Sequence, residues 1–176
     1  MDERTGTRSM AALRTITLVG AVLTTGWSAG LFYAYACSVM PGLAVVGDRA
    51  FIDTMQRINT AILNGWFMLS FLGAPVLIVA AGVLQWRAGS RTALAWLAAA
   101  AVLSLAVLVI TGVVNVPLND RLAAAGAPDA LTDPAAVRAA FEDVWVRWNV
   151  VRAVASTAAF GCVTWALVVA GRSSAA

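Results

Sequence analysis

Residues 92–114, TALAWLAAAAVLSLAVLVITGVV, decide the fold of this chain. No charged residue occurs between Arg91 and Asp120. A helix needs about 20 mostly apolar residues to cross the roughly 30 Å hydrocarbon layer of a bilayer. A strand of a membrane barrel would be about ten residues long and would alternate in polarity. This run therefore predicts a membrane-spanning α-helix.

Three other stretches have the same character, and they cover residues 15–39, 60–84 and 150–170. The 176-residue chain is 61% hydrophobic and 12% charged, and its mean hydropathy is +0.82. A soluble domain is about 45–50% apolar and about 25% charged. The surplus apolar surface needs an apolar solvent, so the lipid bilayer is the expected partner. We predict an all-α, integral membrane four-helix bundle that forms one domain over residues 1–176.

The four spans assign each connection to one side of the membrane. Residues 40–59 and 115–149 form two polar loops on one side, and the termini and the turn at 85–91 lie on the other. Lys and Arg near span ends favour the cytoplasmic side, but the twelve arginines divide equally between the two sides. When the loop arginines that lie in motifs are left out of the count, most of the remaining arginines lie on the side of the termini. We therefore expect a cell-membrane protein with both termini in the cytoplasm. The net charge of +3 is too small to predict nucleic-acid binding.

Proline and acidic residues predict where the helices begin and end. Met40-Pro41-Gly42 should stop the first helix, and Asn115-Val116-Pro117-Leu118-Asn119 should stop the third, because proline lacks a donor and restricts the preceding residue. Asp48 should begin a helix that runs on into the second span. Asp133 followed by Pro134 is typical of a helix N-terminus, and no further proline interrupts residues 134–170. We therefore expect one helix over that whole range.

A short pattern occurs twice, once in each polar loop. Residues 51–59 (FIDTMQRIN) and 141–149 (FEDVWVRWN) both read F-x-D-x-x-x-R-x-N, and each enters a span. We interpret the pair as a duplicated helical hairpin, with the two copies related by an axis along the membrane normal. The alternative is convergence, because early acids and later arginines suit any helix that leaves a membrane interface.

Polar side chains recur at helical spacing at the loop end of the second and fourth spans. The stripe in the second span consists of Gln56, Asn59, Thr60 and Asn64. The stripe in the fourth consists of Trp145, Asn149, Arg152 and Ser156. Polar groups at membrane depth usually face the bundle interior or a cavity. The alternative is that the polar side chains form hydrogen bonds between helices and that Trp and Tyr anchor the protein at the membrane interface.

Arg152 is the only charge inside a predicted span, and an intramembrane arginine needs a partner. We expect it to lie in a cavity in the outer half of the bundle, together with the two polar stripes. Asn115 and Asn119, at the end of the third span, should line the same cavity, with Tyr33 or Tyr35 at its wall. The chain has no histidine, which excludes a haem His ligand and a Ser-His-Asp triad. We predict no metal site and no cofactor.

The chain resembles the anthrone oxygenase-like family of four-span membrane proteins, many of which are bacterial and have no assigned function. The matching segments are Gly30 to Tyr35 (GLFYAY), residues 40–43 (MPGL), Phe51, residues 55–59 (MQRIN), residues 115–119 (NVPLN) and residues 145–152 (WVRWNVVR). Fungal relatives oxidise an anthrone to an anthraquinone with molecular oxygen and are thought to need no metal or flavin. The resemblance implies a membrane-embedded, cofactor-independent monooxygenase of a lipophilic aromatic.

The resemblance and the chemistry together suggest roles for individual residues. The expected catalytic residues are Arg152, Asn149 and Asn119, which would hold an oxyanion, and Tyr35, which would move a proton. The expected substrate-binding residues are Tyr33, Gln56, Asn59, Asn115, Trp145 and Trp148. The nearest candidates for a base are Asp53 and Asp143, although each has a neighbouring arginine. The alternative function is a non-catalytic bundle that binds a lipid or quinone, or that supports a partner membrane protein.

Overall fold

The computed structural model describes residues 3–175, and this part of the chain is helical with short turns between the helices. The α-helices are α1 (Glu3–Ala34), α2 (Met40–Ala44), α3 (Asp48–Ala61), α4 (Gly65–Arg87), α5 (Arg91–Ile110), α6 (Val116–Ala124), α7 (Pro134–Ala139) and α8 (Glu142–Ala175). Two π-helical turns, η1 (Tyr35–Val39) and η2 (Thr111–Asn115), join α1 to α2 and α5 to α6, and a 3-10 turn, η3 (Pro128–Ala130), precedes α7.

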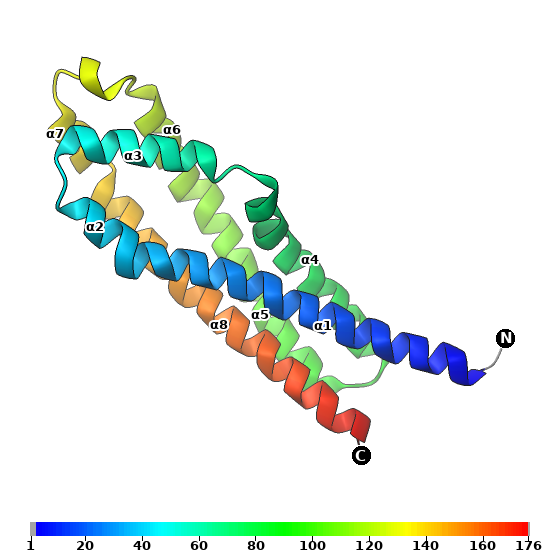
Figure 1. Cartoon of the computed structure of the whole chain (residues 1–176). Coiled ribbons are helices and arrows are strands. Elements are labelled where there is room, and N and C mark those ends of the chain that lie inside the picture. Colours follow the sequence, from blue (N-terminus) through cyan, green and yellow to red (C-terminus); the bar gives the residue numbers. More distant parts are fainter. Residues whose placement is uncertain (1–2, 176) are drawn as a thin grey trace.

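Four helical segments are long and apolar enough to cross a membrane, as the sequence predicted. They cover Arg8–Ala44, Gly65–Arg87, Arg91–Ala124 and Pro134–Arg172. The long helices run side by side, and both termini and the α4–α5 turn lie at one end of the bundle (Figure 1). The short helices α3, α6 and α7 lie at the other end, which we call the loop end. The predicted all-α membrane bundle is confirmed.

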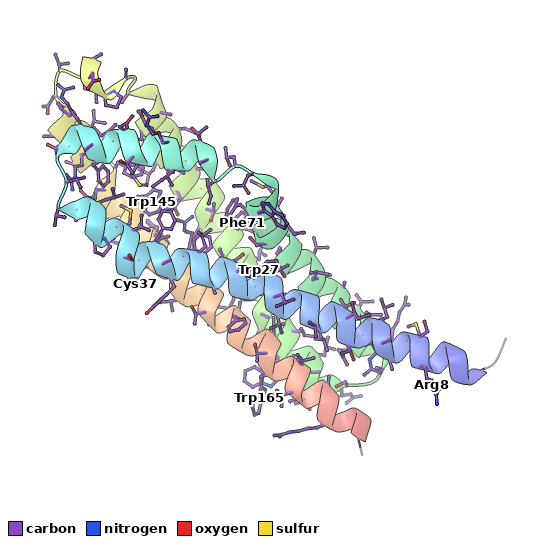
Figure 2. The ribbon with its side chains drawn as sticks, viewed as in Figure 1. Arg8, Trp27, Cys37, Phe71, Trp145 and Trp165 are labelled. Atoms are coloured by element: carbon purple, nitrogen blue, oxygen red, sulfur yellow. The ribbon has the colours of Figure 1, made fainter. Side chains whose placement is uncertain are left out.

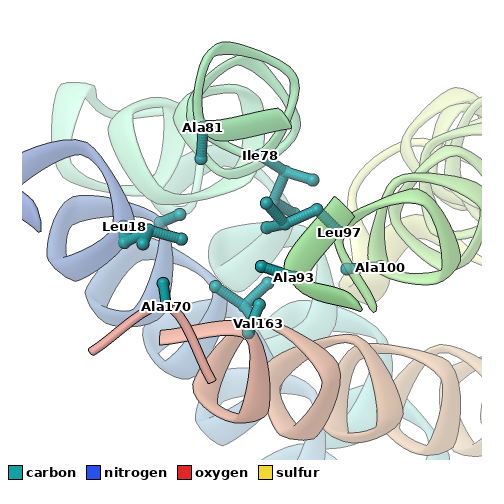
Figure 3. Packing of buried hydrophobic residues seen from close by; sticks show 10 residues of the cluster. Leu18, Ile78, Ala81, Ala93, Leu97, Ala100, Val163 and Ala170 are labelled. Carbon is teal, nitrogen blue, oxygen red and sulfur yellow. The ribbon is translucent and has the colours of Figure 1, made fainter. Parts of the chain in front are cut away.

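A dry core holds the helices together toward the terminal end. Leu18, Ile78, Leu97 and Val163 meet there from four different helices, with small alanines between them (Figure 3). Lipid is as apolar as these side chains, so the helices associate mainly through close packing, which small residues allow. At the loop end, a second core cluster contains larger side chains from α3, α6, α8 and the turn before α8, including Phe51, Met55, Leu122, Phe141 and Trp145.

The prolines do not stop the first and third helices, so that prediction was wrong. The backbone N–H of Met40 bonds the carbonyl of Tyr35, and that of Val116 bonds the carbonyl of Thr111, in each case five residues back. A proline in a regular α-helix loses a donor and its ring clashes with the carbonyl four residues earlier. A wider π turn just before each proline lets the helix continue, to Ala44 and to Ala124.

The helix beginning at Asp48 does not run on into the second span, which corrects a further prediction. A turn over residues 62–64 separates α3 from α4. The side chain of Asn64 accepts hydrogen bonds from the backbone N–H groups of Trp66 and Phe67, so it caps α4. Asn64 therefore does not continue the polar stripe of α3. The span begins at Gly65 rather than at residue 60.

Residues 134–170 also differ from the expected single helix. The predicted N-cap is present, because Asp133 accepts a hydrogen bond from the backbone N–H of Ala136. The helix is interrupted by a turn at residues 140–141, after α7 and before α8. The carbonyl of Phe141 then receives the N–H of Trp145 at 3.0 Å, which is the first bond of the new helix.

Two contacts agree with the predicted repeat of the hairpins. Phe51 and Phe141 hold the same position in the two motifs, and their rings pack edge to face at 6.1 Å. Asp48 and Arg138 each lie three residues before that phenylalanine, and they form an ion pair at 3.1 Å. A two-fold relation brings equivalent residues near the axis into mutual contact. The turn at residues 62–64, by contrast, occurs in the first copy and has no counterpart in α8.

Candidate functional site

A cavity of about 300 Å³ opens at the loop end of the bundle. Its walls come from α1, η1, α3, the α3–α4 turn, α4, η2, α6 and α8. Sites for small molecules typically measure about 300–1,000 Å³ and are mostly apolar with a few placed polar groups. The cavity is therefore large enough for one small ligand. The lining residues are Leu31, Phe32, Tyr35, Gln56, Ile58, Asn59, Thr60, Ile62, Leu63, Phe67, Thr111, Asn115, Val116, Asn119, Asp120, Ala123, Trp145, Asn149 and Arg152.

Arg152 is the buried charged group among the lining residues, and only 5% of its surface is exposed. Its guanidinium donates to Oδ1 of Asn149 at 3.1 Å and to Oγ1 of Thr111 at 3.3 Å, while Nε has no partner. Within residues 3–175, no carboxylate forms an ion pair with Arg152. A buried charge without a counter-ion is costly, and the cavity is where a counter-ion could bind.

Aromatic rings surround the guanidinium. Its carbon lies 4.5 Å from the centre of the Phe32 ring and 5.3 Å from that of Trp145. Rings attract a cation through their negative faces, which partly compensates Arg152 for its lost hydration. Tyr35 packs on Trp145 at 5.7 Å, and Nε1 of Trp145 donates to Oδ1 of Asn119 at 2.9 Å. The rings are therefore fixed in place before any ligand arrives.

Two asparagines connect the site to the backbone of neighbouring helices. Asn149, 1% exposed, donates to the carbonyl of Phe32 at 3.2 Å. Asn115 is equally buried and donates to the carbonyl of Trp145 at 3.4 Å, while its Oδ1 has no partner. Asn59, across the cavity on α3, has an unpaired Nδ2. Buried donors and an acceptor around the cavity thus lack a hydrogen-bond partner within residues 3–175.

The two π turns contribute directly to the site. Tyr35 is the first residue of η1, and η2 begins with Thr111 and ends with Asn115. A π turn adds one residue to a helical turn and so changes which side chains face inward, and such turns are frequent at functional sites. The proline that follows each π turn fixes its position in the chain.

Helix α3 covers the loop end of the cavity. Nε2 of Gln56 donates to the carbonyls of Leu122 and Gly126, at 2.8 and 3.0 Å. These carbonyls lie in the last turn of α6 and just beyond its end, so Gln56 holds α3 against this end of α6. Gln56 and Asn59 both line the cavity from this helix.

Eight of the ten predicted site residues line this one cavity. They are Tyr35, Gln56, Asn59, Asn115, Asn119, Trp145, Asn149 and Arg152. Tyr33 is 62% exposed and Trp148 is partly buried, and neither lines the cavity. Trp145 lies at the loop end of α8, far from Trp165 near the other end of the helix (Figure 2).

The carboxylates lie elsewhere than expected. Arg57 donates to Asp53 at 2.8 Å on the exposed face of α3, and this hydrogen bond holds the pKa of Asp53 below its ordinary value. Asp143 is exposed, and neither it nor Asp53 lines the cavity. Asp120, on α6, does line it, and its side chain is open to solvent. Its position next to Asn119 was the sequence signal that could have identified it.

No group of three or more His, Cys, Asp or Glu side chains in the described part of the chain is placed to hold a metal ion. The arrangement can therefore be described by its organic groups. A buried cation, several amide groups and aromatic walls suit a flat, lipophilic molecule that carries a negative or developing negative charge on oxygen.

Comparison with known proteins identifies one family. The family model described as anthrone oxygenase matches residues 67–162, which is more than half of the chain. The matched region runs from α4 into α8 and includes Arg152, Asn149 and Asn115. The search of curated proteins and the search of solved structures gave no match.

Proposed function

The chain belongs to the anthrone oxygenase family, and we propose that it oxidises a lipophilic, anthrone-like aromatic with molecular oxygen inside the membrane, without a metal or flavin. The observation that carries the proposal is Arg152, a buried cation that has no carboxylate partner among the described residues and faces an aromatic cavity. A substrate that becomes an oxyanion during the reaction would supply the missing negative charge.

The chemistry needs little from the protein. Loss of a proton from the acidic CH₂ group of an anthrone gives an oxyanion, which transfers one electron to O₂. The resulting carbon radical and superoxide combine and take up a proton to form a hydroperoxide. Loss of water from the hydroperoxide leaves a carbonyl, so CH₂ and one O₂ become C=O and one H₂O. The protein must hold the ring system, accept the first proton and stabilise the oxyanion.

Each of these tasks has a candidate in the cavity. Arg152 and Asn149 are hydrogen-bonded to each other and would bind the oxyanion, with the free amide nitrogen of Asn119 as a third donor. Trp145 and Phe32 would hold the rings. Asp120 is the carboxylate that lines the cavity, and we assign it the proton acceptor role in place of Asp53 and Asp143. Tyr35 would relay the proton between the substrate and Asp120.

Oxygen consumption tests the proposal. Purified protein in lipid nanodiscs is mixed with anthrone, and O₂ uptake and anthraquinone absorbance are recorded against empty nanodiscs. We expect one O₂ consumed per anthraquinone formed, and one labelled oxygen atom in the product when ¹⁸O₂ is used. Arg152→Leu should lower the rate by about 10²–10³-fold, which is the usual cost of losing an oxyanion donor. Arg147→Leu, at an exposed position of the same helix, is the matched control.

Other outcomes have clear meanings. Equal rates for the wild type and Arg152→Leu would refute the assigned role of Arg152. Binding of the aromatic without any O₂ uptake would favour the second candidate function, a non-catalytic bundle that binds a lipid or quinone or supports a partner membrane protein. The same cavity and the same buried charge support that candidate.

We also propose that both termini face the cytoplasm, so that the cavity opens toward the outer side of the cell membrane. The proposal rests on the arginines near the termini and the α4–α5 turn, with the equally numerous loop arginines discounted because some lie in motifs. Single cysteines at positions 126 and 89, in a variant without Cys37 and Cys162, provide the test. A membrane-impermeant thiol reagent added to intact cells should label position 126 only. Labelling of position 89 alone would reverse the orientation.

A further inference from the structure

A second, much smaller void lies in the middle of the bundle. Its volume is about 20 Å³, and its walls come from all four spanning helices. Ser156 lies one turn beyond Arg152 on α8, so the void lies behind the arginine as seen from the loop end. Phe71 lines the void and packs on Phe32 and Phe67, which both line the larger cavity. An aromatic wall therefore separates the two spaces.

Of the four hydroxyl side chains around this void, that of Thr25 bonds its own helix and the three serines do not. Thr24, Thr25 and Ser70 each donate to a carbonyl of their own helix, at 2.6–2.9 Å. The side chains of Ser28, Ser104 and Ser156 form no hydrogen bond with any described residue, although each residue is 9% exposed or less. These three unbonded serines come from α1, α5 and α8, and all three line the void.

A proline removes one regular helical hydrogen bond at the same place. Pro75 lies inside α4 and has no N–H to give to the carbonyl of Phe71, four residues earlier. Both residues line the void. Carbonyls freed by proline in membrane helices are commonly satisfied by hydroxyl side chains or by ordered water. The void thus gathers unbonded serine hydroxyls from three spans, next to a carbonyl of the fourth span that lacks its usual helical donor.

We propose that this void is a binding site for a single water molecule, which bridges α1, α5 and α8 through Ser28, Ser104 and Ser156. A void of this volume is just above the roughly 10–15 Å³ that one water needs, and a buried water typically has two to four polar partners. Each serine can donate or accept, and the shielded hydroxyl of Ser28 reaches the water after a rotation about its Cα–Cβ bond. Dioxygen or an acyl chain would fit poorly, because neither satisfies a hydroxyl group. The site is independent of the proposed oxygenase activity.

A crystal structure of the whole protein, grown in a lipidic mesophase and collected with and without xenon pressure, tests this directly. We expect a density peak within hydrogen-bond distance of at least two of the three serine hydroxyls, and no xenon there. Xenon is the probe because it fills dry apolar voids and cannot satisfy hydroxyls. An empty void, or xenon bound in the wild-type protein, would overturn the proposal.

Thermal unfolding in detergent gives a second, independent test that uses single and double substitutions. If one water links Ser28 to Ser104, the double variant Ser28→Ala/Ser104→Ala should lower Tm by less than the sum of the two single variants, because the first substitution already weakens the bridge. Ser28→Ala/Ser70→Ala is the matched control, since Ser70 is similarly buried but bonded to its own helix, and it should be additive. Additive Tm changes in both pairs would contradict the bridge.

Discussion

The two hairpins of this protein have a common plan but make different contributions to the site. Each contains a spanning helix, a π turn with a proline two residues beyond it, and the F-x-D-x-x-x-R-x-N motif. In the first hairpin the motif helix, α3, ends at Ala61 and lies across the loop end against α6 and α7 (Figure 1). In the second, α8 continues from the motif through the bundle.

This difference places the buried charge on one side of the cavity. The residue three positions after the motif asparagine is Ile62 in the first copy and Arg152 in the second. Ile62 lies in the turn before α4, whereas Arg152 lies on a continuous helix and is buried. The first motif helix therefore covers the cavity, and the second forms its polar wall. Two similar sequence motifs thus contribute differently to the site, because only the second lies on a helix that continues through the bundle.

The largest effect on stability should come from the contact between the two copies. Arg138, with 13% of its side chain exposed, bonds Asp48, Glu142 and three carbonyls in or just after α2. Arg138→Leu should lower the free energy of unfolding in mild detergent by about 3 kcal/mol, the low end for breaking a buried pair, because both carboxylates keep some solvent contact. Arg57→Leu, which removes an exposed i,i+4 pair with Asp53, should change it little. Equal losses of stability in Arg138→Leu and Arg57→Leu would mean that the contact between the two hairpins contributes no more than an exposed surface pair.

The motif asparagines allow a sharper comparison. Asn149 bonds the carbonyl of Phe32 and the guanidinium of Arg152, so Asn149→Ala should cost about 2 kcal/mol by leaving buried partners unsatisfied. Asn59 has an unpaired amide nitrogen, and Asn59→Ala should cost much less. Denaturant unfolding of both variants measures the difference. A larger loss of stability in Asn59→Ala than in Asn149→Ala would contradict the assignment of Asn149 as the asparagine with buried hydrogen-bond partners.

The break in the first copy depends on a cap. Asn64 accepts the N–H groups of Trp66 and Phe67 at 3.0 and 3.1 Å. Asn64→Ala should lower the free energy of unfolding by about 1 kcal/mol, and Asn64→Asp should retain most of the stability because Asp is also a good cap. If Asn64→Ala is as stable as the wild type, the turn between α3 and α4 has another cause.

The smallest effect should come from the exposed pair on α3. Arg57 lowers the pKa of Asp53, so this carboxylate contributes stability above its unfolded pKa of about 3.9, and the contribution is lost as the pH falls through the lower folded pKa. Because the pair is exposed, Asp53→Asn should leave Tm at pH 7 unchanged within error. When the pH is lowered below about 4, the Tm of the variant should fall slightly less than the Tm of the wild type. A clear drop of Tm at pH 7 would indicate a structural role that the exposed pair does not suggest.

The sequence predicted the features that depend on composition and on helical spacing. Four apolar runs gave the spans, Asp133 with Pro134 gave a helix start, and the spacing from Trp145 to Arg152 placed one face of α8 in the cavity. It did not predict the π turns, because proline is expected to end a helix unless the preceding turn widens.

Other features could not be predicted because the residue type fits two structures. Asn64 continues a polar stripe and is also a good N-cap, so the break at residues 62–64 was missed. Tyr33 and Tyr35 are two residues apart and so point about 200° apart on a helix. Only one of them could face the cavity, and the apolar residues around them do not reveal which one.

The most direct test of the central claim is a comparison of two aromatic ligands of similar shape. A hydroxyanthraquinone in its ionised form carries an oxyanion, and anthracene carries no charge. By fluorescence titration in nanodiscs, we predict that the wild type binds the anion at least about ten-fold more tightly than anthracene, a difference of about 1.4 kcal/mol. Arg152→Leu should bind both ligands with similar affinity, and Arg152→Lys should recover only part of the preference, because an ammonium lacks the planar fork of Arg. An undiminished preference for the anion in Arg152→Leu would contradict the claim that Arg152 is the anion-binding group of the cavity.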